Sequence, residues 1–222
     1  MLDLTTPRGR IIAAALRLAE RRSWRDLTLA DIADEAGIAL VDLSHEFHAK
    51  TDILRAFVKA ADDEVLRRAP KRNEDQSARD RIFDVVMTRF DVLAPYRVAL
   101  KKIMWSVPFE PALVPTMLCS QHWMLEAAGI ASDGLSGGVR VVGLGSVYAR
   151  VFRIWLEDDD PGLARTMAAL DRRLKRGEQA LGRMDDICSA GRRLVCAVLP
   201  RGFRRPEERA DTPRAADGPT YT

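Results

Sequence analysis

Apolar residues recur at intervals of three or four positions along almost the whole chain, and no segment alternates apolar and polar residues. This period predicts an all-α protein. The first helix is expected to begin at Thr6 and Pro7, a hydroxyl cap followed by a proline at the first helical position. Thr28, three residues before Asp31, is expected to cap a second helix that ends at Gly37.

Helices are also expected at about 39–46 and 50–68, and a polar linker at 70–77. The pattern divides the chain into four parts: a helix-turn-helix head at 1–68, a larger helical body at 69–184, a short amphipathic helix at 185–200, and a disordered tail at 201–222.

In the body, one helix is expected to end before Pro95. Further helices are expected at 96–107, 116–128, 139–156 and about 163–181, with a loop at 132–138. The segment 139–156 is apolar nearly all round, so both of its faces must be covered. Three arginines and two glycines interrupt it, which favours a buried helix over a membrane span.

Charge changes this picture more by its distribution than by its sum. The 222 residues carry 35 Lys and Arg against 32 Asp and Glu, a net charge of +3. Residues 1–70, however, contain eleven basic and twelve acidic side chains. The head is therefore slightly negative, and the basic excess lies elsewhere.

Candidate chemistry is sparse. Cys119, Cys188 and Cys196 have no metal-ligand spacing, so we expect reduced thiols in the cytoplasm and no metal site. The chain has no glycine-rich phosphate loop and no nucleophile or zinc-protease motif. We expect no enzyme, no catalytic residue and no cofactor.

The segment 10–57 resembles the TetR family of bacterial regulators. The resemblance is carried by these residues: Ile11-Ile12-Ala13-Ala14-Ala15, Thr28-Leu29-Ala30-Asp31-Ile32-Ala33, Ala36-Gly37-Ile38, Leu43, Phe47, Lys50 and Ile53-Leu54. It implies a TetR-like fold and a homodimeric transcriptional regulator, a repressor, that binds a double-stranded DNA operator with its third helix in the major groove.

The same resemblance implies that Thr28 and Lys50 contact backbone phosphates. The residues of the third helix that would face DNA are Ala39, Leu40, Val41, Asp42, Ser44 and His45. His48 and the arginines of the first helix are further candidate partners.

The third helix departs from the family at four positions. Ser44 replaces an aromatic residue and Val41 a small one, while Asp42 and Glu46 add negative charge to a helix that must approach a polyanion. A head that keeps the fold but no longer reads DNA is therefore the alternative.

Residues 120–181 resemble the C-terminal domain of COQ9-type proteins, which are lipid-binding accessory factors of ubiquinone biosynthesis with a TetR-like fold. The resemblance is carried by His122-Trp123-Met124, the run from Tyr148 to Asp160, and the run from Thr166 to Leu174. It implies an alternative function, a lipid-binding protein that has lost DNA binding and docks peripherally on a membrane.

Large apolar side chains of the body form a candidate pocket for an apolar small molecule or lipid: Trp105, Phe109, Met117, Trp123, Met124, Phe152 and Trp155. An ordinary aromatic core is the alternative. In the regulator hypothesis, a ligand bound there changes the spacing of two heads and releases DNA, and the helices at 139–156 and 163–181 form the dimer interface.

The segment 187–199 contains apolar residues with basic neighbours. The residues expected to face a membrane in the alternative function are Leu194, Val195, Val198 and Leu199, with Arg192 and Arg193 beside them. Packing of this helix on the body is the other possibility.

Overall fold

The first two helices are fixed by the caps that the sequence predicts. The computed structural model describes residues 1–70, 75–106 and 110–180. In helix α1 (Pro7–Arg21), the Gly9 N–H donates to the Thr6 hydroxyl at 3.1 Å. A short 3-10 helix, η1 (Trp24–Asp26), leads to α2 (Leu29–Ala36), which ends at Gly37 with φ 65°.

Two further helices complete the head: α3 (Leu40–Glu46) and α4 (Lys50–Arg68). The bounds of α4 agree with the prediction. Leu43 and Phe47 are buried against α1 and α2 and therefore fix α3 across α2. Burial of these apolar side chains provides the main stabilisation of the small core.

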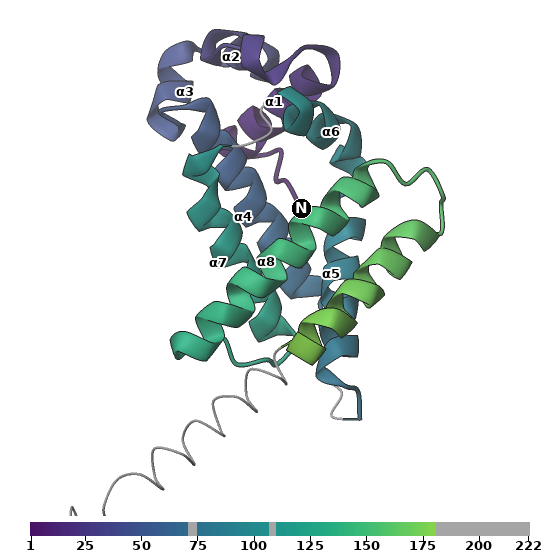
Figure 1. Cartoon of the computed structure of the whole chain (residues 1–222). Coiled ribbons are helices and arrows are strands. Elements are labelled where there is room, and N and C mark those ends of the chain that lie inside the picture. The colour runs from purple at the N-terminus through teal and green to yellow at the C-terminus, as the bar shows by residue number, and fades with distance from the viewer. Residues whose placement is uncertain (71–74, 107–109, 181–222) are drawn as a thin grey trace, which may run out of the picture. The chain divides into compact units, whose positions relative to one another are not determined.

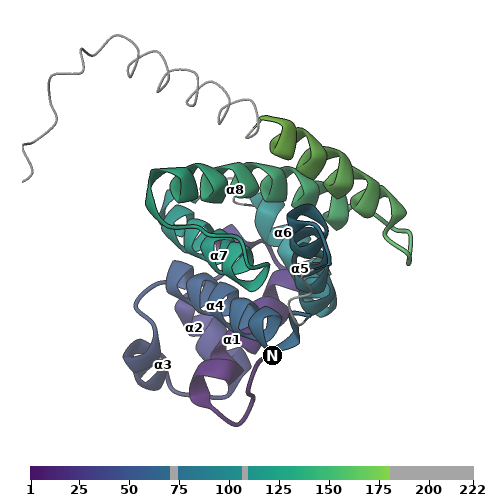
Figure 2. The same ribbon diagram turned by 90° about the horizontal axis from the view of Figure 1, so that it is seen from below.

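The body contains helices α5 (Ala78–Leu93), η2 (Ala94–Tyr96), α6 (Arg97–Ser106), η3 (Pro111–Leu113), α7 (Val114–Ala127) and α8 (Gly134–Leu156), followed by helical residues at 164–180. In both ribbon views α8 and residues 164–180 lie side by side and form an outer layer over α5 and α7 (Figures 1 and 2). The described residues contain no strand, which confirms the all-α prediction. None of the described helices is long and apolar enough to cross a membrane.

The start of α8 corrects one prediction. Residues 134–138 are helical, whereas the sequence predicted a loop at 132–138. Glycine is a poor helix former, and this segment contains three glycines. A Cβ atom on Gly137 would lie 2.1 Å from the Ser132 carbonyl carbon, so the backbone passes too close there for a side chain. Gly137 therefore permits a close backbone contact between the first turn of α8 and the segment just before it.

A buried ion pair joins α4 to the body. The Arg89 guanidinium of α5 donates to the Asp62 carboxylate of α4 and, at 3.0 Å, to the Tyr148 hydroxyl of α8. The Ser120 hydroxyl of α7 donates to the same Asp62 oxygen at 2.7 Å. All four residues are buried. The cluster thus links four helices through one carboxylate and one guanidinium.

Arg89→Met is expected to lower the free energy of unfolding by about 3–5 kcal/mol, because it leaves the Asp62 charge buried without its partner. Urea denaturation at fixed protein concentration measures the change. Arg150→Met, at an exposed position of α8, is the matched control and should change stability by less than about 0.5 kcal/mol. Equal effects of the two substitutions would contradict this role of Arg89.

Candidate nucleic-acid interface

The start of α2 is a complete capping box. The Asp31 N–H donates to the Thr28 hydroxyl oxygen at 3.1 Å, and the Thr28 N–H and hydroxyl donate back to Asp31 Oδ2 at 2.8 and 2.7 Å. The hydrogen bonds from Thr28, together with the Arg22 guanidinium, lower the pKa of Asp31 to about 2. Thr28 is exposed, as a phosphate contact requires, but both of its donors are already used by Asp31.

The outer face of α3 is apolar and exposed. The side chains of Leu40 and Val41 are 51% and 60% accessible, although residues of this kind are commonly buried. Ala39, Ser44 and His45 are also exposed. Asp42 is exposed as well, so the structure places all six predicted third-helix contacts on the surface. Such a face suits apolar contact with thymine methyl groups, and His45 adds a hydrogen-bonding group.

Arginines of α1 lie against several carboxylates of the head. Arg8 contacts Glu46 of α3 at 3.6 Å, and its guanidinium lies 4.7 Å from the centre of the Phe47 ring. Arg17 and Arg21 both contact Glu35, at 3.0 and 2.8 Å. Glu46, one of the two acids of α3, therefore lies beside a cation, although these pairs leave the net charge of the head unchanged.

Asp42 differs from these acids, because it is exposed and has no ion-pair partner among residues 1–70, 75–106 and 110–180. Ser44, at the position where the family has an aromatic residue, donates its hydroxyl proton to the Val41 carbonyl at 2.7 Å. It can still accept a hydrogen bond, but it offers no donor to a phosphate in this conformation.

Lys50 has a structural set of partners. Its ammonium donates to the carbonyl oxygens of Trp24, Arg25 and Leu27 at distances between 2.5 and 3.2 Å. Burial lowers the pKa of Lys50, and the charges of Asp26 and Asp31 oppose that change. An ammonium has three donors, and here all three are used inside the protein. Lys50 thus ties the start of α4 to the turn that precedes α2.

The predicted pocket residues lie in three different surroundings. Trp155 and Met124 are fully buried, and Trp155 stacks on Phe90 and Phe152 with ring centres 5.3 and 5.4 Å apart. Trp105 and Trp123 are exposed, on α6 and α7 respectively.

Met117 is half-buried, and Phe109 lies outside the described residues, as do the six predicted membrane-facing residues at 192–199. A crevice between α4, α5 and α7, too narrow to hold a water molecule, is lined by Trp123 and Met124 together with Asp62, Leu66 and Arg89.

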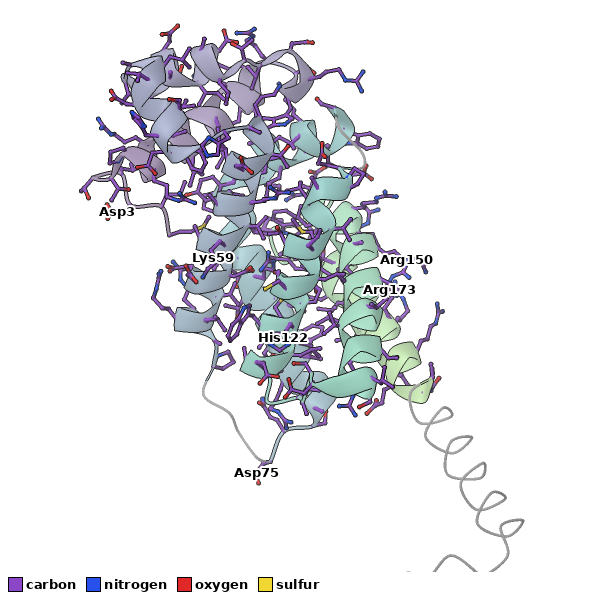
Figure 3. All side chains as sticks on the ribbon, turned by 90° about the vertical axis from the view of Figure 1, so that its left-hand side faces the viewer. Asp3, Lys59, Asp75, His122, Arg150 and Arg173 are labelled. Carbon is purple, nitrogen blue, oxygen red and sulfur yellow. The ribbon has the colours of Figure 1, made fainter. Side chains whose placement is uncertain are left out.

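The acidic motif after α8 has a structural role. The Asp158 carboxylate is buried and accepts the Thr166 N–H at 2.8 Å and the Thr166 hydroxyl at 2.7 Å. Burial raises the pKa of Asp158, but these hydrogen bonds outweigh it and the pKa lies below its usual value. In α7, His122 lies toward the end of the body away from the head (Figure 3) and bonds to the Ser132 hydroxyl at 2.7 Å.

Reasoning from the sequence did not assign Asp62 and Arg89, and it gave Lys50 a phosphate contact rather than its inward-facing role. A signal for the first two is visible in the pattern. Arg89 falls in the apolar series Ile82, Val85, Val86, Phe90 and Leu93, and Asp62 lies beside Ala61 and Val65 on the inner face of α4. Charged residues at inner positions of two helices indicate a buried pair.

The head, from α1 into α4, matches a known family. Residues 11–57 fit the family model described as bacterial regulatory proteins, tetR family. A comparison with curated proteins found no match.

Solved structures extend the likeness over the body. The chain is similar to the TetR transcriptional regulator from Nitrosomonas europaea, with 25% identity over 78% of this chain and 98% of that chain and a TM-score of 0.59. A TetR transcriptional regulator from Rhodococcus sp. RHA1 is 19% identical over 79% of this chain and 97% of its own, with a TM-score of 0.60.

A tetR-family transcriptional regulator from Streptomyces coelicolor is also 19% identical, over 88% of this chain and 90% of its own, with a TM-score of 0.57. None of these three is a lipid-binding protein of ubiquinone biosynthesis, so that resemblance stays a prediction. The family match covers the DNA-binding head, and the regulator fold continues through the body. The head therefore belongs to the tetR family of bacterial regulatory proteins, and the body has the fold of solved TetR transcriptional regulators.

Proposed function

We propose that this regulator is a homodimeric repressor that reads an operator with the exposed face of α3. The observation that carries the proposal is the combination of buried anchors and exposed contacts on one short helix: Leu43 and Phe47 fix α3, while Leu40, Val41 and His45 face outward. A helix held in this way can enter a major groove without a change in the head.

The proposed phosphate contacts come from α1 rather than directly from Thr28 or Lys50, because the donors of both residues are used inside the head. The Arg8 side chain is 54% exposed despite its contact with Glu46, so it lies open to a phosphate beside α3. Lys50 contributes by fixing the turn before α2, which sets the angle between α2 and α4.

We place the dimer interface on the outer layer formed by α8 and residues 164–180. Leu135 and Val142 are 94% and 59% exposed, and Val139 and Gly143 lie on the same exposed face of α8. A Cβ atom added to Gly143 would have no other atom within 4 Å, so the surface there is open to a second helix. An exposed apolar stripe on a helix favours burial against an identical stripe in a two-fold dimer.

We place the apolar ligand in the crevice between α4, α5 and α7. The crevice is too narrow to hold even a water molecule, so a ligand must move α4 away from α7 to enter. Because α4 begins at Lys50 in the head, such a displacement changes the head as well. A ligand that binds the displaced arrangement more tightly would shift the protein away from its DNA-binding state.

Val41→Glu is expected to weaken binding to duplex DNA flanking the gene at least about tenfold, because it puts a carboxylate on the face that reads bases. Electrophoretic mobility shift measures the affinity. Stability should be unchanged, because Val41 is exposed. Val114→Glu, at an exposed apolar position at the start of α7, is the matched control and should bind normally. The proposed reading face is wrong if both variants bind DNA alike.

Lys50→Ala is expected to lower the free energy of unfolding by about 1–3 kcal/mol, because three carbonyl groups lose their charged donor. It should weaken DNA binding without changing the slope of log K against log salt. A direct phosphate contact would instead reduce that slope by about 0.9 and leave stability nearly unchanged. Salt-titrated binding and urea denaturation of the same preparation separate the two roles.

Val142→Glu is expected to convert the dimer to a monomer, because two carboxylates would face each other across the two-fold axis. Sedimentation velocity measures the oligomeric state. Val114→Glu again serves as control and should remain dimeric. A Val142→Glu dimer as stable as that of the natural protein would move the interface to another surface.

A further inference from the structure

An open cleft lies where the head meets α6. Its volume is about 800 Å³. The residues that line it come from the end of α1, from η1 and from α6: Arg21, Arg22, Ser23, Arg25, Asp26, Val98, Lys101, Lys102, Trp105 and Ser106. Figure 1 shows α1 and α6 next to each other at this place, beside the turn that leads into α2.

The lining combines positive charge with an exposed aromatic ring. Five lining side chains are basic and one is acidic. Lys101 is exposed and has no hydrogen-bond or ion-pair partner among the residues that the structure describes. Trp105 is 69% exposed, although tryptophan is usually well covered. A flat ring beside several cations suits a ligand that is itself aromatic and anionic.

Three hydrogen bonds across the cleft join the head to α6. Lys102 Nζ donates to the Glu20 carbonyl at 2.5 Å, and Arg25 Nη2 donates to the Ser106 carbonyl at 3.3 Å. The Ser23 hydroxyl donates to the Ser106 hydroxyl, also at 3.3 Å. Two of these acceptors are neutral carbonyl oxygens. A phosphate or carboxylate is a stronger acceptor for the same cations, so an anion could take Arg25 and Lys102 from them.

We propose that this cleft binds a small planar aromatic anion of the nucleotide type. Its ring stacks on Trp105, and its anionic group is held by Lys101, Lys102 and Arg25. The cleft is distinct from the crevice between α4, α5 and α7. A small ligand fits it better than duplex DNA, because the bases of a duplex are already stacked and leave no free ring face for an indole.

Binding would have a defined mechanical consequence. When the anion replaces the carbonyls as partner of Arg25 and Lys102, two of the three cross-cleft hydrogen bonds are lost. The Arg25 carbonyl, on the same residue, accepts from Lys50 at 3.2 Å. Occupancy of the cleft therefore acts on the turn that sets the start of α2, and through it on the DNA-binding head.

Calorimetric titration of the full chain with adenosine 5′-monophosphate, adenosine and pyrophosphate tests the proposal, with tryptophan fluorescence as second readout. The monophosphate should bind at least about tenfold more tightly than adenosine, which lacks the charge, or pyrophosphate, which lacks the ring. Trp105→Leu and Lys101→Ala should each weaken its binding about tenfold.

Two matched variants control for general effects: Trp123→Leu, the other exposed tryptophan, and Lys175→Ala, an exposed lysine at 164–180, should bind normally. The proposal is overturned if the monophosphate does not bind at millimolar concentration, or if Trp105→Leu binds it as well as the natural protein does. Ligand binding is measured without DNA, so failure here leaves the repressor proposal standing, and failure of DNA binding leaves this one standing.

Discussion

The buried pair of Arg89 and Asp62 is the interaction on which the arrangement of this molecule depends most. Helix α4 belongs both to the head, which it enters at Lys50, and to the body, where Asp62 lies. The guanidinium and carboxylate, with Ser120 and Tyr148, bind α4 to α5, α7 and α8 inside an otherwise apolar core. Because an unpaired buried charge is costly, this cluster opposes sliding of α4 along its neighbours and gives the body a defined position to depart from when a ligand binds.

At the other end of α4, Lys50 holds the helix to the rest of the head, as Arg89 holds it to the body. Its ammonium closes the turn at Trp24–Leu27, whose outer side lines the basic cleft. A head that carries slightly more acids than bases is therefore compatible with DNA binding. Several of its acids lie against arginines of α1, one lysine organises the backbone, and an exposed apolar face is left on α3. The charge that DNA meets at α3 therefore depends on where the charged side chains lie and not on the net charge of the head.

The sequence predicted local features well and long-range partners poorly. The caps at Thr6 and Thr28, the end at Gly37 and the bounds of α4 follow from residues adjacent in the chain, and the structure confirms them. The predicted start of α8 was wrong, because Gly137 lies in the helix and permits a close backbone contact with Ser132. The partners of Lys50 lie more than twenty residues away, and those of Arg89 come from three other helices, so no local pattern names them.

DNA recognition by this head, with its few free cations, decides how the molecule works. Salt-titrated binding of the full chain to duplex DNA flanking its gene, run beside binding to anionic lipid vesicles, tests it most directly. We expect specific DNA binding whose log K falls linearly with log salt, with a slope of about 0.9 for each phosphate contacted, and no comparable affinity for vesicles. Absence of DNA binding even at low salt, together with tight vesicle binding, would contradict it.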